Sequence, residues 1–205
     1  MTTSHIKAIV FDFGGVLLGW DPRRLYQRYF PGQPQAMEDF LTEVGFHEWN
    51  LQQDKGRPFA QATALLSAEF PHRAQLIGAY FENYEESLTG PIAGSIHLLQ
   101  RLKAGGHPLY GLTNWSSETF PRARRQYGFF DLFDDIVVSG AVNHIKPEPE
   151  IYHILLQKIG RPAQDCLLID DSLPNVQQAQ RLGFDAIRFE SSEQLESALR
   201  ERNLL

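Results

Sequence analysis

Side chains that could catalyse a reaction together occur in four stretches of the sequence. Each stretch follows a run of residues typical of a buried strand. These side chains are Asp12, Thr113 with Asn114, Lys146, and Asp170 with Asp171. Carboxylates, a hydroxyl and a lysine suit phosphoryl transfer, in which positioning and charge neutralisation do most of the work. In this interpretation the carboxylate of Asp12 is the nucleophile that attacks phosphorus.

The other groups of this set would manage charge. Asp12, Asp170 and Asp171 together favour a hard divalent cation bound through oxygen, for which Mg²⁺ is the natural candidate. Such a cation offsets repulsion between the nucleophile and an anionic phosphate, and it polarises a phosphoryl oxygen. Thr113 offers a hydroxyl, and Lys146 offers a fixed positive charge to the phosphate and to Asp12. The residues predicted to bind the substrate are Thr113, Asn114 and Lys146.

Strands and helices must alternate to bring these residues together. Asp12 follows a short apolar run typical of a strand buried on both faces, and the glycine pair 14–15 allows a sharp turn after it. Further strands are predicted over 108–112, 136–138, 166–169 and 186–189, and helices over 96–103, 116–127, 150–159, 174–182 and from 192 onward. Ser116 or Ser117, and later Ser192, are expected to cap helices. Right-handed crossovers place the strand ends at one edge, so we expect an α/β, Rossmann-like, doubly wound parallel sheet.

Residues 19–88 have a different pattern. Helices are predicted over 22–30, 35–44, 58–70 and 73–88, without a convincing strand, and this block holds half of the chain's aromatic residues. We therefore expect a core of residues 1–18 and 89–205, with residues 19–88 forming an inserted helical cap that could close over the substrate. An inert helical appendage is the alternative. Candidate substrate contacts in the insertion are Trp20, His47, Trp49 and Arg57.

Composition narrows the class of protein. The 205 residues are 21% charged and 42% apolar, with a formal net charge of -6, as in an ordinary globular protein. The chain has neither a basic patch for nucleic acid nor an apolar run long enough for a membrane span. Its first five residues do not resemble a secretory signal, so we expect a cytoplasmic protein. Cys166, the single cysteine, is expected to pack in a strand. Composition does not indicate an oligomeric state.

The four stretches, taken in order and spacing, resemble the four motifs of the haloacid dehalogenase-like hydrolase superfamily. The matching segments are 12–17, 112–114, 146–152 and 169–175. The resemblance covers the whole chain. Within the superfamily, the chain is most similar to the branch that has a helical cap inserted after the first motif. That branch includes small sugar-phosphate phosphatases and the phosphatase domain of soluble epoxide hydrolases.

This resemblance implies a Mg²⁺-dependent phosphatase that acts on a small phosphorylated metabolite, such as a sugar phosphate. It implies an aspartyl-phosphate intermediate on Asp12, with the carbonyl of Gly14 joining Asp12, Asp170 and Asp171 around the metal. Thr113 would bind phosphate, and Lys146 would hold the charges together. Asn175 stands where many relatives carry a further acidic residue.

Gly14 departs from the family pattern. Most phosphatases of this superfamily have an aspartate at this position, which protonates the leaving group and then activates water. General acid–base catalysis is typically worth about 10² to 10⁴ in rate. We therefore expect the preferred substrates to have leaving groups that need little protonation, such as sugar 1-phosphates, acyl phosphates or aryl phosphates.

Two other functions use the same pocket. A 2-haloacid dehalogenase shares the nucleophile, the lysine and the cap but works without metal, and it has neutral residues in the fourth motif and an aromatic residue two positions after the nucleophile. Asp170, Asp171 and Gly14 argue against it. A phosphate-ligand-binding protein with weak turnover is the second alternative, and undetectable phosphate release from a broad panel of esters would favour it.

Overall fold

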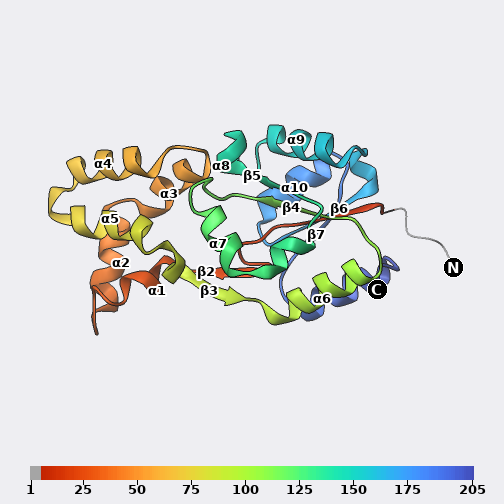
Figure 1. Cartoon of the computed structure of the whole chain (residues 1–205), viewed down its shortest axis with the longest axis horizontal. Helices are drawn as coiled ribbons and strands as arrows, with labels where there is room; N and C mark the ends of the chain where they lie inside the picture. Colours follow the sequence, from red (N-terminus) through yellow and green to blue (C-terminus); the bar gives the residue numbers. More distant parts are fainter. Residues whose placement is uncertain (1–5) are drawn as a thin grey trace.

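A five-stranded parallel sheet lies at the centre of the computed structural model, which describes residues 6–205 (Figure 1). The strand order is β5-β4-β1-β6-β7, and all neighbouring strands are parallel. The strands are β1 (Ala8–Phe11), β4 (Leu109–Thr113), β5 (Asp135–Val138), β6 (Cys166–Asp170) and β7 (Asp185–Arg188). The predicted α/β fold class is confirmed. The expectation about a secretory signal in residues 1–5 lies outside the described residues.

Helices cover both faces of this sheet because the side chains of β1 alternate between them. Ala8 and Val10 join an apolar cluster with residues of α9, whereas Ile9 and Phe11 join a second cluster that includes residues of α6 and α11. The helices that follow the insertion are α6 (Ala93–Ala104), α7 (Phe120–Gln126), α8 (Ser139–Val142), α9 (Pro149–Ile159), α10 (Leu173–Arg181) and α11 (Ser192–Glu201), with 3₁₀ turns at Gly128–Leu132 and Ala163–Asp165. Across residues 6–205, every helix falls short of the length and apolar content that crossing a membrane requires.

A second group of helices extends beyond the sheet and is drawn in orange and yellow in Figure 1. We call it the helical insertion: α1 (Pro22–Tyr26), α2 (Pro34–Glu43), α3 (Phe46–Asp54), α4 (Phe59–Glu69) and α5 (Ala74–Glu82), with 3₁₀ turns at Pro71–Arg73 and Tyr84–Ser87. Its aromatic residues pack against one another and belong to the same apolar cluster as Ile9 and Phe11 of β1. The ring of Tyr80 lies 4.8 Å from that of Phe46 and 5.9 Å from that of Trp49, in edge-to-face contacts that add to the apolar burial.

The predicted absence of strands between residues 19 and 88 is wrong. A two-stranded antiparallel sheet, β2 (Leu18–Trp20) and β3 (Leu88–Pro91), forms where the chain leaves and re-enters the core. Both strands are too short to show the alternation of apolar and polar side chains that marks a strand in a sequence, and each contains a glycine. Gly19 allows the close approach, because a Cβ there would lie 1.9 Å from Oγ1 of Thr89. Pairing of distant segments, not local propensity, creates this sheet.

Helix α3 is also absent from the sequence-based prediction. Gly45 reads as a breaker, but it adopts a left-handed conformation with φ of 57° and links α2 directly to α3. The helix buries Phe46, Trp49 and Gln53 against the insertion's core, which stabilises a segment of weak amphipathic pattern.

Two predicted helix caps need correction. The helix expected to start at Ser116 or Ser117 begins at Phe120, because Oγ of Ser116 accepts a hydrogen bond from the backbone N–H of Glu118 in a turn before it. The C-terminal helix is capped by Ser191, whose side chain accepts from the N–H of Gln194, and not by Ser192. Such local serine bonds compete with helix starts one or more residues away.

Candidate active site

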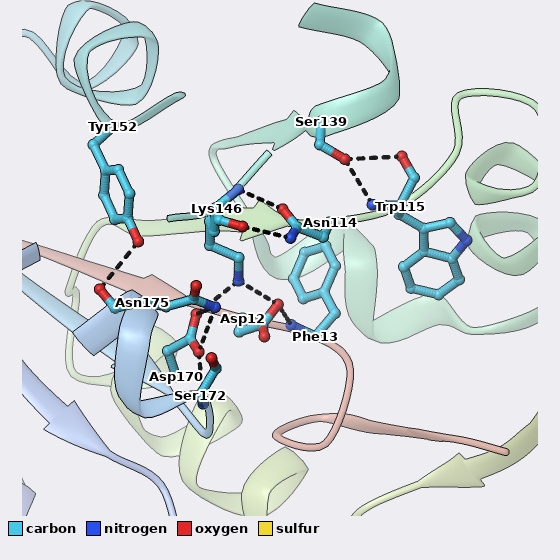
Figure 2. A network of polar contacts seen from close by, with 10 residues as sticks. All are labelled: Asp12, Phe13, Asn114, Trp115, Ser139, Lys146, Tyr152, Asp170, Ser172 and Asn175. Atoms are coloured by element: carbon cyan, nitrogen blue, oxygen red, sulfur yellow. Dashed lines mark hydrogen bonds and ion pairs between the residues drawn. The ribbon is translucent and has the colours of Figure 1, made fainter. Parts of the chain in front are cut away.

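Asp12 lies at the carboxyl end of the central strand β1, where it is almost fully buried. Its Oδ1 accepts from the backbone N–H of Phe13 at 2.7 Å and lies 2.8 Å from Nζ of Lys146 (Figure 2). Both contacts fall on Oδ1, so among residues 6–205 Oδ2 is the oxygen left for attack. Burial raises the pKa of Asp12 to about 7, the nearby Asp170 carboxylate acts in the same direction, and Lys146 opposes both. Keeping this nucleophile ionised therefore requires positive charge beside it.

Lys146 supplies part of that charge from the loop between α8 and α9. Its Nζ lies 2.8 Å from Oδ1 of Asp12 and 2.7 Å from Oδ2 of Asp170, and the side chain is 1% exposed. Burial alone would lower the pKa of Lys146, but the two adjacent carboxylates raise it overall. The lysine therefore remains a cation and links the first and last motifs of the site.

Asp170 is the last residue of β6 and Asp171 follows it, and the two carboxylates have different surroundings. The two oxygens of Asp170 accept from Lys146, from the backbone N–H of Ser172 at 2.9 Å, and from Nδ2 of Asn175 at 3.0 and 3.2 Å (Figure 2). These donors take up most of its accepting capacity. Asp171 is exposed at the cavity, so its carboxylate is the more open of the pair.

A cluster of carboxylate oxygens makes a divalent cation site chemically sensible here. One oxygen each from Asp12, Asp170 and Asp171 lies within 4.8 Å of the others. Hard oxygen donors of this kind suit Mg²⁺. Gly15 is required beside them, because its φ is +74° and a Cβ there would lie 2.3 Å from Oδ2 of Asp171. Gly14 lines the cavity next to Asp12.

Asn114 and Thr113 reach the same edge at the end of β4. Thr113 is 1% exposed and lines the cavity, as its predicted role requires. Asn114 also lines it, but its side chain bonds the main chain of Lys146: Oδ1 accepts from the N–H at 2.7 Å, and Nδ2 donates to the carbonyl at 3.0 Å. The geometry therefore shows Asn114 holding the lysine loop, in addition to any contact with substrate.

Asn114→Ala is expected to weaken this placement of Lys146. Removing both hydrogen bonds leaves two backbone groups without these partners, at a cost of about 1–3 kcal/mol. We expect a lower midpoint of urea unfolding and a fall of about tenfold in kcat/KM, because the ammonium is no longer held beside Asp12. Asn83→Ala is the matched control, since Asn83 bonds a carbonyl of its own helix in the insertion. Equal kcat/KM for the two variants would contradict the positioning role.

A cavity of about 380 Å³ opens above these residues, between the strand ends and the helical insertion. Trp20 and His47, two of the predicted contacts, line it. Trp49 and Arg57 do not: Nε1 of Trp49 donates to the carbonyl of Ala62, and Arg57 donates to the carbonyl of Trp49. Sequence reasoning missed further lining residues, namely Leu18, Asn50, Leu51, Asp54, Tyr84, Leu88, Trp115 and Thr119. Their spacing along the chain shows no motif, because the folding of the insertion over the sheet brings them together.

Polar contacts hold the insertion against the core around this cavity. Oγ of Ser139 donates to the carbonyl of Asp54 at 2.5 Å, and the N–H of Phe59 donates to Glu118 at 2.9 Å. Lys55 pairs with Glu148 across the same boundary. Residues of α3 and of the strand ends therefore line one cavity in this structure.

Known proteins that resemble this chain in sequence or in fold include phosphatases and other HAD family enzymes. The sesquiterpene phosphatase AstK of Aspergillus oryzae is 29% identical over 187 residues, which are 91% of each protein. The HAD family enzyme BT-2542 of Bacteroides thetaiotaomicron has a similar fold, with a TM-score of 0.76 at 22% identity over 95% of this chain and 98% of that one. A further structure of that enzyme, with a TM-score of 0.68 at 23% identity over 91% and 95% of the two chains, holds magnesium and inorganic phosphate.

A dehalogenase with a similar fold is also found. The L-2-haloacid dehalogenase of Xanthobacter autotrophicus has a TM-score of 0.63 at 21% identity, over 96% of this chain and 83% of that one. The fold alone thus does not separate phosphatase from dehalogenase chemistry. The model of the family described as haloacid dehalogenase-like hydrolase matches residues 6–183. The resemblance found in the four motifs is confirmed, and this chain belongs to the haloacid dehalogenase-like hydrolases.

Proposed function

We propose that this protein is a Mg²⁺-dependent phosphatase that hydrolyses a small phosphorylated metabolite through an aspartyl-phosphate on Asp12. The observation that carries the proposal is the cluster of Asp12, Asp170 and Asp171 beside Lys146, in which Asp12, Asp171 and Lys146 line one cavity and Asp170 lies buried behind them. Three carboxylates beside one buried lysine form a site with excess negative charge, which a divalent cation would balance. The similarity to a sesquiterpene phosphatase supports the same reaction class.

Each residue of the cluster has a proposed role. Oδ2 of Asp12 attacks phosphorus, Lys146 stabilises the nucleophile and the phosphate, and Thr113 binds phosphate oxygens. Asp12, the carbonyl of Gly14 and Asp171 would hold Mg²⁺, and Asp170 would contribute while also fixing Lys146. When bound, the ion supplies Lewis acidity and offsets the charge of the phosphate. The bonds that Asn175 donates to Asp170 assign it a supporting role.

The insertion completes the proposed site as a cap. In this proposal residues 19–88 move relative to a core of residues 1–18 and 89–205, so that the substrate enters and is then enclosed. The antiparallel pair of β2 and β3 is where the chain crosses between the two parts. The contacts of Lys55 and Phe59 with the core would break on opening.

The side chains that line the cavity also indicate which organic group the substrate carries. Its wall is mainly apolar and includes Leu18, Trp20, Leu51, Leu88 and Trp115. An apolar group gains free energy by leaving water for such a wall, whereas each sugar hydroxyl needs a hydrogen-bonding partner there. We therefore propose that the substrate is a phosphate ester with a mainly apolar organic group, rather than the sugar phosphate expected from the sequence.

A panel of phosphate esters with and without Mg²⁺ tests this function. We expect phosphate release from an isoprenyl monophosphate, with a kcat/KM at least about tenfold above that for glucose 6-phosphate, since burial of a few methylene groups exceeds 1.4 kcal/mol. EDTA is expected to abolish release, and added Mg²⁺ to restore it. Halide release from 2-chloropropionate in EDTA would instead support the dehalogenase. Binding of phosphate esters without any turnover would support a ligand-binding protein.

A further inference from the structure

The proposed reaction needs a proton donor that the residues around Asp12 do not supply. In the proposed site Asp12, Asp170 and Asp171 surround a cation, and Lys146 is shared by two carboxylates. Position 14, two residues after the nucleophile, is a glycine. An alkoxide is a poor leaving group unless it is protonated as the bond to phosphorus breaks. Another element must therefore provide the acid.

Asp54 stands at the end of α3 and lines the same cavity as Asp12. Nδ2 of Asn50 donates to its Oδ2 at 3.1 Å, and the backbone N–H of Ser116 also donates to its carboxyl group. Its own carbonyl accepts from Oγ of Ser139 at 2.5 Å. Bonds from both the insertion and the core thus hold this carboxyl group at the roof of the site.

The surroundings of Asp54 favour a carboxyl group that can give and take a proton near neutrality. Burial raises the pKa of Asp54 to about 7, although the N–H of Ser116 opposes the rise. Tyr80 and Tyr84 face it, and their own pKa values lie well above the usual range, so both are neutral phenols. The other charged or titratable groups on neighbouring elements or across the cavity are Asp12, His47, Lys55, Arg57, Glu118, Lys146 and Asp171. Lys55 pairs with Glu148, and within residues 6–205 no cation forms an ion pair with Asp54.

We propose that Asp54 is the general acid and base of the reaction, supplied by the helical insertion in place of the side chain missing at Gly14. This role rests on the proposed phosphatase activity. As Oδ2 of Asp12 bonds to phosphorus and the ester P–O bond breaks, the carboxyl group of Asp54 gives its proton to the departing oxygen. The resulting carboxylate then takes a proton from the water that attacks the aspartyl-phosphate, which releases phosphate and restores Asp12.

This assignment changes the expected substrate range. A chain without an acid would favour anomeric, acyl or aryl phosphates, as the sequence suggested. With Asp54 over the cavity, ordinary alkyl phosphates are substrates as well, and the reaction proceeds only when the insertion is closed. Closure would therefore both enclose the substrate and complete the catalytic set.

Asp54→Asn tests the role by the nature of the leaving group. The ratio kcat/KM covers the steps up to the aspartyl-phosphate, so it reports protonation of the leaving oxygen. We expect a loss of about 10²-fold or more for an alkyl phosphate and of less than about threefold for p-nitrophenyl phosphate, whose phenolate leaves without protonation. Asp39→Asn, on an exposed face of α2 beside Gln35, is the matched control and is expected to match the wild type on both esters.

A rescue and a pH profile complete the experiment. Apart from Gly14 and its two chain neighbours, no heavy atom of residues 6–205 lies within 4 Å of a Cβ built on Gly14, so the site has space for the first atom of a side chain. Gly14→Asp added to Asp54→Asn is expected to restore hydrolysis of the alkyl phosphate by tenfold or more, within the range of acid catalysis. The wild-type kcat/KM for that ester should fall above about pH 7, where Asp54 loses its proton, and this fall should vanish in Asp54→Asn.

Two results would overturn the role of Asp54 while leaving the phosphatase intact. One is an equal loss for both esters in Asp54→Asn, which indicates a structural part in holding the insertion. The other is no loss for either ester. A wild-type protein that hydrolyses neither ester with Mg²⁺ would overturn the phosphatase proposal itself, and the role of Asp54 with it.

Discussion

Asp12→Asn is expected to abolish phosphate release, with kcat/KM falling by about 10⁴-fold or more, as for loss of other covalent nucleophiles. The amide cannot form the acyl phosphate, although its oxygen can still accept from Lys146 and Phe13, so the fold should persist. The measurement is release of phosphate from p-nitrophenyl phosphate with saturating Mg²⁺. Rapid acid quenching of the wild type should in addition trap phosphate on the protein, and the variant should trap none.

Asp21→Asn gives a control of equal chemistry for this experiment. Asp21 caps α1 through the N–H of Arg23, and its half-exposed side chain is not among the residues that line the cavity. An asparagine can cap a helix nearly as well. We expect wild-type kinetics for this variant. If Asp12→Asn instead keeps kcat/KM within tenfold of the wild-type value, Asp12 is not the nucleophile. A water molecule activated by the metal would then be the attacking group.

Lys146→Met is expected to have the largest effect on stability. It leaves Asp12 and Asp170 buried without their shared counter-ion, and breaking a buried pair in this way costs about 3–5 kcal/mol. The variant should therefore unfold at much lower urea concentration at pH 8 in the absence of Mg²⁺. The loss should shrink towards pH 5, because burial raises the pKa of Asp12 to about 7, and protonation removes its unpaired charge.

The pH trend follows from which state binds more protons. The pKa of about 7 for Asp12 in the wild type includes the lowering by Lys146, which the variant loses. Near pH 6 the variant's folded form therefore holds a proton on Asp12, whereas its unfolded form has released that proton at the ordinary value of 3.8. Stability of the variant thus falls as pH rises between these values. Lys158→Met is the control, because Lys158 pairs with Asp135 at the surface, where such a pair is worth about 0–1 kcal/mol. Equal losses in the two variants at pH 8 would show that Lys146 is not the counter-ion of the site.

The sheet and the edge that carries the site were accessible to sequence reasoning for a physical reason. Strands buried on both faces read as continuous apolar runs, as in Cys166–Asp170, and parallel strands joined by right-handed crossovers must end at one edge. The positions of Asp12, Thr113 and Asp170 at neighbouring strand ends follow from these two facts. Local pattern and topology therefore point to the same set of residues.

Elements that depend on distant partners escaped the same reasoning. β2 exists only because Leu18–Trp20 pairs with a segment about 70 residues later, and α3 owes its stability to the aromatic core that it packs against. The role of Asn114 likewise depends on the main chain of Lys146, 32 residues away. None of these contacts produces a repeating pattern of apolar residues or a recognisable motif in the sequence.

The sequence by itself predicted which side chains meet at one edge of the sheet. Asp12, Thr113 and the acidic pair 170–171 stand at or next to strand ends, where the backbone geometry of a parallel sheet leaves them little freedom. Only the tertiary structure decided what lies above that edge. The cavity wall and the position of Asp54 over it depend on how the helical insertion packs against the core, and that packing is set by many weak contacts between segments far apart in the chain.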